Sequence, residues 1–464
     1  MARWMPVLLL PLLSCSFTTL SRDRCVSTSE CRNTFGLGYE CSDDGYCDLG
    51  VDFPRCDEAI SAPLDTPVEP VSVGSLLFHE TDSISVEAAR LAVIQANATG
   101  GVAGRPIRLV ECDYSSLVND GRDVETAIGD AARWMIDVGG VTALVGPGSS
   151  SGVVTAWDVV SSRNALLVSP SATSPALTDL DGAEHSDSLP GRVWRTVPPD
   201  SLQGAVLAYD IEQLEHQRVA LIYSDDVYGQ GLRDVISANI GRVIVSEMRF
   251  SAPALIPDHL LELSELDVDA IVMVSPLFVD SVAFLDAVAT LDALKEVQLF
   301  VPDAGAASLV LEAAVDSGTW PRLRGTRPSV EESRVYSSFE TAYAAEYRGR
   351  SPADSSYAPH AFDAMWLALY GAAWAETYGD VASATDWAVG MRHLSAGEPV
   401  ELRATTWLDA QAALASEGQV DIHGASGALD YDPVTQQTTA PIEVWTVDLL
   451  DGEPVVTVQY VVSP

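Results

Sequence analysis

Two turns rich in small, hydroxyl-bearing residues hold the side chains best suited to bind a ligand. Residues 146–151 (GPGSSS) follow an apolar run at 141–145, and residues 169–174 (SPSATS) follow a second run at 165–168. Such runs, each followed by small residues, are typical of buried parallel strands. Ligands bind beyond the carboxyl ends of these strands. Hydroxyl and backbone N–H groups gathered there suit a carboxylate, above all at a helix N-terminus.

The first turn also fits the hydrolase motif Gly-x-Ser-x-Gly, with Ser150 as the nucleophile. A catalytic serine of this kind needs an acid and then a histidine further along the chain. None of the downstream histidines lies in a clear strand-end loop after an acidic strand end. A serine hydrolase is therefore the remote alternative, and we expect no catalytic residue and no enzymatic activity. The histidines considered are His216, His259, His360, His393 and His423.

The N-terminus indicates export. Arg3 precedes a short apolar stretch at 7–13, and the sequence Leu12-Leu13-Ser14-Cys15 resembles a bacterial lipobox. This pattern predicts a signal peptide at 1–14 and lipidation of Cys15, which would anchor the protein to a membrane without a spanning helix. Because Ser16, and not an aspartate, follows Cys15, we expect the outer membrane in preference to the inner one if the cell has two membranes. The alternative is an ordinary signal peptide with a bystander cysteine.

The remaining six cysteines predict disulfide bonds. Four of them repeat one spacing, Cys25-x5-Cys31 and Cys41-x5-Cys47, which is wider than zinc ligands usually have. We therefore expect no metal site and an oxidised microdomain. Among the 15 possible pairings, we expect these four cysteines to pair with one another. We expect the last pair to be Cys56 and Cys112.

Composition narrows the class of partner. The chain has 464 residues and a formal net charge of −40, with Lys295 as its only lysine. Such a chain would be repelled by phosphate backbones, so we expect no nucleic-acid partner. No apolar run after the first fifteen residues approaches the ~18 residues that a membrane span requires.

The order of apolar runs predicts an α/β protein with doubly wound sheets. Strands are expected at 71–78, 107–110, 141–145 and 165–168, with helices between them. A similar half begins near residue 198, although its sequence does not repeat the first half. Its strands are expected at 219–223, 243–250, 270–274 and 299–301.

Several of these segments resemble type I periplasmic binding proteins, the branch that includes the leucine/isoleucine/valine-binding proteins of ABC importers. Each segment alone is a weak signal, but together they follow the family's order across about 390 residues from Val71. The segments are 97–107, 145–150, 169–178, Trp194-Arg195-Thr196 with Asp200 and Gln203, Tyr228-Gly229 with Gly231-Leu232, and 424–432.

The resemblance implies two Rossmann-like lobes joined by three crossover strands, which close on a ligand by a hinge motion. Lobe 1 is expected at 71–197 and 329–395, and lobe 2 at 198–328 and 396–464. A lipidated, disulfide-rich stalk with a proline-rich linker is expected at 15–70.

The resemblance also assigns ligand-binding residues. The two hydroxyl-rich turns would hold an α-carboxylate, Asp303 would meet the ammonium group, Tyr228 would cover the ligand, and Phe278 would contact its side chain. The plainer alternatives are turn residues at the hydroxyls, a helix cap at Asp303 and packing at Tyr228. The turn residues assigned to the carboxylate are Ser149, Ser150, Ser171, Ala172 and Thr173.

Two departures from the family's pattern leave the identity of the ligand open. The loop at 79–83 is short and lacks the glycine-rich form usual in relatives, and Asp303 stands where a glutamate is common. The expected function is a lipid-anchored solute-binding protein for an amino acid or a related carboxylate, working with an ABC permease and without a cofactor. The alternative is a ligand sensor that signals to a separate protein.

Overall fold

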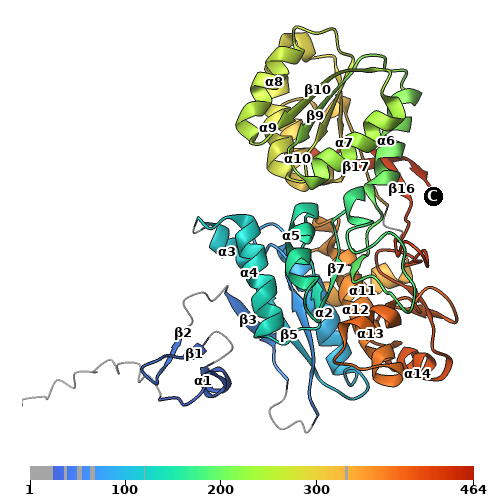
Figure 1. Ribbon diagram of the computed structural model, residues 1–464. Coiled ribbons are helices and arrows are strands. Elements are labelled where there is room, and N and C mark those ends of the chain that lie inside the picture. The colour runs from blue at the N-terminus through green and yellow to red at the C-terminus, as the bar shows by residue number, and fades with distance from the viewer. Residues whose placement is uncertain (1–23, 36–38, 50–54, 63–67, 120, 330–332) are drawn as a thin grey trace, which may run out of the picture. The chain divides into compact units, whose positions relative to one another are not determined.

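The computed structural model consists of two compact units, one up to Phe53 and one from Pro54 onward (Figure 1). Cys15 and the predicted signal peptide lie outside the described residues. Within the described residues, no helix combines the length and the apolar character needed to cross a membrane. The structure describes residues 24–35, 39–49, 55–62, 68–119, 121–329 and 333–464.

The small unit is one helix followed by a two-stranded antiparallel sheet. Helix α1 (Thr28–Phe35) precedes strands β1 (Tyr39–Cys41) and β2 (Cys47–Leu49). Two disulfide bonds supply stability that so small an apolar core does not provide.

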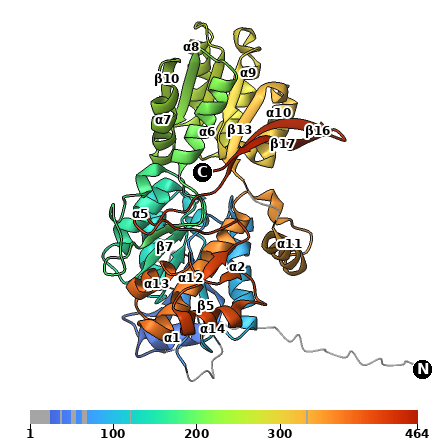
Figure 2. The same ribbon diagram turned by 90° about the vertical axis from the view of Figure 1, so that its right-hand side faces the viewer.

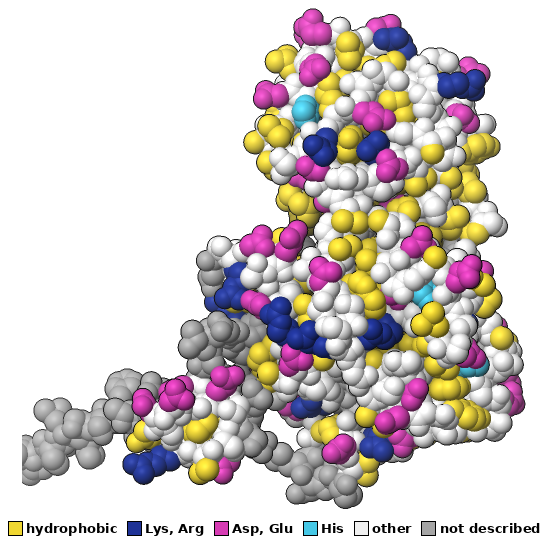
Figure 3. Space-filling view, in the orientation of Figure 1, with side chains coloured by type: hydrophobic (Ala, Val, Ile, Leu, Met, Phe, Trp, Pro, Cys, Tyr) yellow, Lys and Arg dark blue, Asp and Glu magenta, His cyan; other side chains and the backbone are white. Residues whose placement is uncertain are grey.

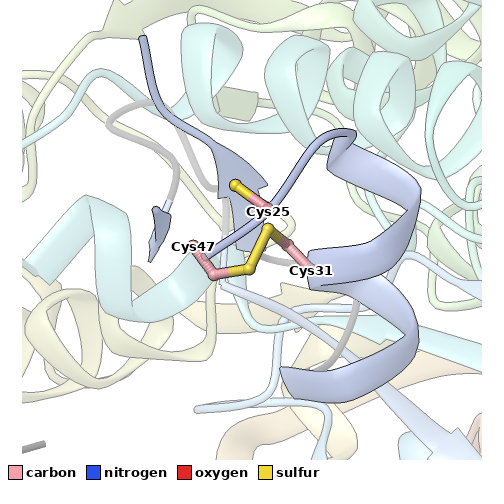
Figure 4. Close-up of side chains that lie close together, drawn as sticks. All are labelled: Cys25, Cys31 and Cys47. Carbon is pink, nitrogen blue, oxygen red and sulfur yellow. A yellow bond between two sulfur atoms is a disulfide. The ribbon is translucent and has the colours of Figure 1, made fainter. Parts of the chain in front are cut away.

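These bonds join Cys25 to Cys41 and Cys31 to Cys47. The four cysteines therefore pair with one another, as predicted. The sulfur atoms of Cys25, Cys31 and Cys47 lie within 4.8 Å of one another (Figure 4). All three are oxidised in disulfide bonds, so they offer no thiolate to a metal ion.

The large unit contains a six-stranded sheet, and we call the part built on it lobe 1. The strand order is β3-β5-β4-β6-β7-β8. All neighbours are parallel except β3, which runs antiparallel to β5. The inner strands are buried on both faces, which explains their continuous apolar sequences. The strands are β3 (Cys56–Ile60), β4 (Val71–Ser75), β5 (Ile107–Cys112), β6 (Ala143–Val145), β7 (Leu166–Ser169) and β8 (Val193–Arg195).

Helices from two distant parts of the chain cover this sheet. The N-terminal half supplies α2 (Ser83–Ala98), α3 (Tyr114–Asn119), α4 (Val124–Asp137) and α5 (Ser150–Val160). The almost wholly buried helix α12 packs along α2 and joins one core cluster with the strands (Figure 2). The later helices are α11 (Arg334–Glu346), α12 (Ala358–Tyr378), α13 (Ala384–Met391) and α14 (Trp407–Glu417).

A seven-stranded sheet forms lobe 2, with the order β10-β9-β11-β12-β13-β16-β17. Its first five strands are parallel, and β16 and β17 form an antiparallel hairpin at one edge (Figure 2). The strands are β9 (Val219–Ser224), β10 (Ile244–Phe250), β11 (Ala270–Val274), β12 (Gln298–Val301), β13 (Leu323–Pro328), β16 (Ile442–Leu450) and β17 (Glu453–Val462).

Two apolar layers hold the helices of lobe 2 to its sheet. Helices α6 and α7 pack in one core cluster, and α8, α9 and α10 pack in another. The chain passes between the two sheets after β8, after β13 and before β16, which gives the three crossings of the expected fold. The helices are α6 (Asp200–Gln213), α7 (Val227–Ile240), α8 (Ile256–Leu263), α9 (Phe278–Ala289) and α10 (Ser308–Asp316).

The structure corrects two predicted boundaries. Residues 56–60 were assigned to the stalk and linker, but β3 pairs with β5 at the edge of the first sheet. Residues 396–464 were assigned to lobe 2, but Trp407, Leu414 and Ile422 belong to the core cluster of lobe 1. Strands β14 (Pro399–Glu401) and β15 (Asp421–His423) form a small parallel sheet in this segment. Only the final hairpin joins the second sheet.

Cys56 and Cys112 are directly paired in the β3–β5 register and are joined by the predicted disulfide bond. We expect the double variant Cys56→Ser/Cys112→Ser to lose roughly 2–4 kcal/mol of unfolding free energy, since the bond closes a long loop in the unfolded chain. Urea denaturation followed by circular dichroism measures the loss. The matched variant Cys31→Ser/Cys47→Ser alters only the small unit and should leave the main transition in place. An unchanged transition in the first variant would contradict this role.

Candidate functional site

Three loops at the carboxyl edge of the first sheet meet at Gly148. A Cβ atom placed on Gly148 would lie 2.9 Å from Ser171 Oγ and 3.2 Å from Asp82 Oδ2. These neighbours come from the loops after β7 and β4, and Gly148 itself follows β6. Gly146 has a φ of +106°, and a Cβ there would lie 2.3 Å from the Leu76 carbonyl oxygen. Only glycine permits this close approach of the loops.

The hydroxyls predicted to bind a ligand tie two of these loops together. Ser149 caps α5, because its Oγ accepts a hydrogen bond from the Gly152 N–H at 3.2 Å. Ser150 Oγ accepts from the Ser174 N–H at 3.2 Å. Ser171 Oγ donates to the Gly148 carbonyl at 3.0 Å. The structure thus brings the two predicted turns together and uses their side chains to fix their shape.

Thr173 and Ala172 also have partners within the protein. Thr173 Oγ1 donates to Asp200 Oδ2 at 2.8 Å. The Ala172 N–H donates to Ser169 Oγ at 3.1 Å, and the Ala172 carbonyl accepts from Arg195 Nη1 at 3.3 Å. The ligand-binding roles predicted for Ser149, Ser150, Ser171, Ala172 and Thr173 stay predictions.

Asp303 is the point where side chains from both lobes meet. It follows β12, at the start of a short 3-10 helix (Asp303–Ala306), and is buried. Tyr228 from α7 donates to Asp303 Oδ1 at 2.5 Å, and Gln203 Nε2 from α6 donates to the same oxygen at 2.8 Å. Tyr357, which precedes α12 in lobe 1, donates to Oδ2. Asp303 therefore binds side chains and does not act as the helix cap considered above.

Asp200 is a second buried carboxylate in this cluster and is the first residue of α6. Its Oδ1 atom has no hydrogen-bond partner among the described residues, and the same holds for Gln203 Oε1. Burial, with the neighbouring Asp303 carboxylate second, raises the pKa of Asp200 well above its usual range. The Thr173 hydroxyl and the Arg195 guanidinium oppose this rise. An unpartnered acceptor in such a place is unfavourable unless a donor reaches it.

The tyrosines of this cluster are hydrogen-bond donors. Burial, and then the Asp303 carboxylate, raises the pKa of both Tyr228 and Tyr357 well above the usual range. Burial lowers the pKa of Arg195 to about 10, so this guanidinium remains charged at neutral pH. Its N–H groups are directed largely at carbonyl oxygens, including that of Ser174 at 2.9 Å. The cluster thus combines two buried acidic side chains, the hydroxyl donors that bind them and one guanidinium group.

Phe278 lies apart from these contacts. It begins α9, is half-buried and packs against the core of lobe 2. Its proposed contact with the ligand therefore stays a prediction.

The hydrolase alternative has no support in the geometry. All seven histidines lie within the described residues, and none of them is hydrogen-bonded to Ser150. A nucleophilic serine needs a base within hydrogen-bond reach.

Sequence reasoning assigned no ligand-binding role to four residues that lie in or near these loops. Asp200 and Gln203 were noted only as part of the first crossing, although their spacing places both on one side of the first turn of α6. Asp82 was considered as a cap of the helix that follows it, and its loop was noted for being short and without the usual glycines. Tyr357 carries no local signal, because its contact with Asp303 joins the two lobes across 54 residues of sequence.

A sizeable cavity among the described residues lies elsewhere. It has a volume of about 500 Å³ and opens at the amino-terminal edge of the first sheet, beside Arg105 and Arg108. Arg105 pairs with Glu376 at 2.9 Å, and Arg108 bonds to Ser72 Oγ at 3.2 Å. Because these cations are already engaged, the loop cluster around Asp200 and Asp303 is the stronger candidate site.

Two lobes of mainly parallel sheet, with polar loops at the carboxyl ends of their strands, place the chain in the two-lobed α/β class, in which ligands bind at such strand ends. Residues 78–447 match the periplasmic binding protein family, so the chain belongs to this family. The family consists of binding proteins and not of enzymes, in agreement with the geometry at Ser150.

Curated relatives match part of the chain. An amino acid binding protein of Pseudomonas aeruginosa is 30% identical over 155 residues, which cover 33% of this chain and 37% of the relative. A leucine-specific-binding protein of Salmonella typhimurium is 33% identical over 145 residues, covering 31% and 35% of the two chains. The chain thus spans about a third of the length of these relatives.

Solved structures show the same fold. The leucine-binding protein LivK of Thermotoga maritima has a TM-score of 0.65 at 17% identity, covering 85% of this chain and 99% of its own. A solute-binding protein of R. palustris in complex with 4-hydroxybenzoate has a TM-score of 0.66 at 14% identity, with coverages of 85% and 97%. The same architecture therefore holds ligands with and without an amine.

Removing the Tyr357 hydroxyl should weaken the contact between the lobes. We expect Tyr357→Phe to lower the free energy of unfolding by about 1–3 kcal/mol, because a buried carboxylate loses a donor. Urea denaturation measures the loss. Tyr209→Phe is the control, since Tyr209 is 48% exposed, and it should change the stability by less than about 0.5 kcal/mol. The account is wrong if Tyr357→Phe costs as much in an Asp303→Ala background as in the original protein.

Proposed function

We propose that this protein is an extracytoplasmic solute-binding protein that captures an amine-bearing ligand, an α-amino acid in the first instance, for an ABC importer. The observation that carries the proposal is the pair of buried, unpartnered acceptors, Asp200 Oδ1 and Gln203 Oε1, beside the Asp303 carboxylate. An ammonium group supplies N–H donors and a positive charge at one atom. It therefore offsets the cost of burying these carboxylates.

The carboxylate of an amino acid would bind at the predicted turns. The N-terminus of α5 begins at Ser150, and backbone N–H groups there attract anions. The hydroxyls of Ser149 and Ser150 lie in the same turn and accept backbone hydrogen bonds, so their O–H groups can donate hydrogen bonds to a carboxylate. Support for this placement comes from the names of the curated relatives, which bind amino acids or leucine.

The acidic cluster also favours an amine over an aromatic acid as the ligand. A benzoate would bring a negative charge and no N–H donor next to the buried Asp303 carboxylate, so like charges would meet. Because a protein of the same fold binds 4-hydroxybenzoate, the fold does not decide between an amine and an aromatic acid. The residues of the site have to decide. They favour a cationic group.

Delivery to an importer would use a lipid anchor at Cys15. The lipobox-like sequence at 12–15 and the serine after it support an anchor in the outer membrane. Capture would close the two lobes by bending at the three crossings, which leaves the ligand between them.

Three ligands of matched shape test the proposed function: leucine, 4-methylpentanoate, which lacks the amine, and 3-methylbutylamine, which lacks the carboxylate. A ligand present at about 100 times its Kd adds about 2.7 kcal/mol of stability, which thermal unfolding detects as a rise in Tm of several degrees. We expect leucine or the amine to raise the Tm and the plain carboxylate to leave it unchanged. A rise with 4-methylpentanoate alone would overturn the proposal.

The carboxylates can be tested one at a time by calorimetric titration with the amine that binds. We expect Asp303→Asn and Asp200→Asn each to weaken binding about 10- to 100-fold, the loss typical of a charge-assisted contact. Asp267→Asn removes the same charge from lobe 2 at a side chain that is 97% exposed, and should leave the affinity unchanged. Equal affinities for all the proteins would exclude the ammonium site.

A further inference from the structure

An acidic side chain, Asp82, stands at the end of the site where an amino acid would place its carboxylate. Asp82 Oδ2 and Ser171 Oγ both border the position of a Cβ on Gly148, at 3.2 Å and 2.9 Å. The two oxygens are therefore no more than about 6.1 Å apart. Asp82 thus belongs to the same group of loops as the predicted carboxylate site.

Asp82 does not play the structural role that is usual for an aspartate at its position. Asp82 is the N-cap residue of α2, where an aspartate normally accepts a hydrogen bond from the first turn. Its side chain makes no such capping bond. The carboxylate instead lies against the loop that contains Gly148.

The surroundings of Asp82 provide few groups that stabilise a negative charge. Burial raises its pKa to about 6, opposed only by hydrogen bonding from the Phe78 backbone and the Thr81 side chain. The neighbouring ring of Tyr114 is buried and packs edge-on against Phe78 at 5.2 Å. A cationic group of the ligand that contacts the Asp82 carboxylate would offset the cost of burying it.

We propose that the ligand carries two amines, one held by Asp200 and Asp303 and the other by Asp82. This inference rests on the proposed function, because it keeps the first amine where that function places it. The shared chemistry is a pair of ammonium groups on a short flexible chain. Two kinds of compound carry it, namely α,ω-diamines and diamino acids.

The order of the loops sets the two amines at opposite ends of the site. Asp82 borders Gly148 and Ser171, whereas Thr173, two residues further along the same loop, bonds to Asp200. Asp303 adjoins Asp200 on the side of lobe 2. The ligand would therefore extend along residues 171–173, a span suited to a chain of a few carbon atoms.

The test is calorimetric titration of the purified protein with four probes: leucine, butylamine, 1,4-diaminobutane and ornithine. We expect at least one of the two diamino compounds to bind about 10- to 100-fold more tightly than its partner with a single amine, butylamine or leucine. Tighter binding of 1,4-diaminobutane would identify a diamine, and tighter binding of ornithine a diamino acid. If leucine or butylamine binds as tightly as both diamino compounds, the proposal of a second amine is wrong. The proposed function would remain.

The role of Asp82 is tested by Asp82→Asn. This variant should lose the preference for two amines about 10- to 100-fold and keep its affinity for the single amine. Glu80→Gln is the matched control, since Glu80 is an exposed acid in the same loop that bonds to Asn119. It should keep the preference. Loss of the preference in both variants would show a general charge effect and overturn the assignment, and binding of none of the four probes would overturn the proposed function as well.

Discussion

The burial of Asp200 and Asp303 side by side is the constraint on which the account of this protein depends. Two carboxylates removed from water are unfavourable unless donors or cations compensate them. The protein supplies hydroxyl and amide donors from Thr173, Tyr228, Gln203 and Tyr357. It leaves Asp200 Oδ1 without a partner among the described residues. The arrangement is therefore complete only when a further donor is present.

One buried cation, Arg195, connects the loop beside these carboxylates to the crossings between the lobes. Arg195 ends β8, just before the first crossing, and bonds to the carbonyl oxygens of Ala172 and Ser174 in the loop after β7. It also bonds to Gln437 at 2.9 Å, just before the final crossing into β16. A side chain that joins the predicted ligand loop to two crossings links the shape of this loop to the relative positions of the lobes. Ligand binding and lobe closure are thus expected to be coupled.

Much of the candidate site could be located from the sequence, because the loops of the site follow strands with clear apolar patterns. The two hydroxyl-rich turns, Tyr228 and Asp303 could be located since each stands just after a recognisable strand or at a helix start. Tyr357 could not be located, because its role arises from a contact between distant parts of the chain. The helix at 407–417 was assigned to the wrong lobe for a related reason. An apolar helical pattern predicts burial but not the sheet on which the helix packs.

The edge strand β3 shows the same limit on a smaller scale. Its five residues, CDEAI, are too short and too polar to indicate a strand, and only pairing with β5 makes them one. The disulfide could be inferred by eliminating the other cysteines, but the strand could not. The local sequence pattern thus predicts apolar helices and strands, whereas long-range pairing decides where short polar segments lie in the fold.

A crystal structure of the protein with the tightest-binding amine would test the central claim most directly. The account predicts a ligand nitrogen within about 3.2 Å of both Asp200 Oδ1 and a carboxylate oxygen of Asp303. A ligand whose nitrogen lies elsewhere, with a carboxylate or an apolar group against Asp200 and Asp303, would contradict it.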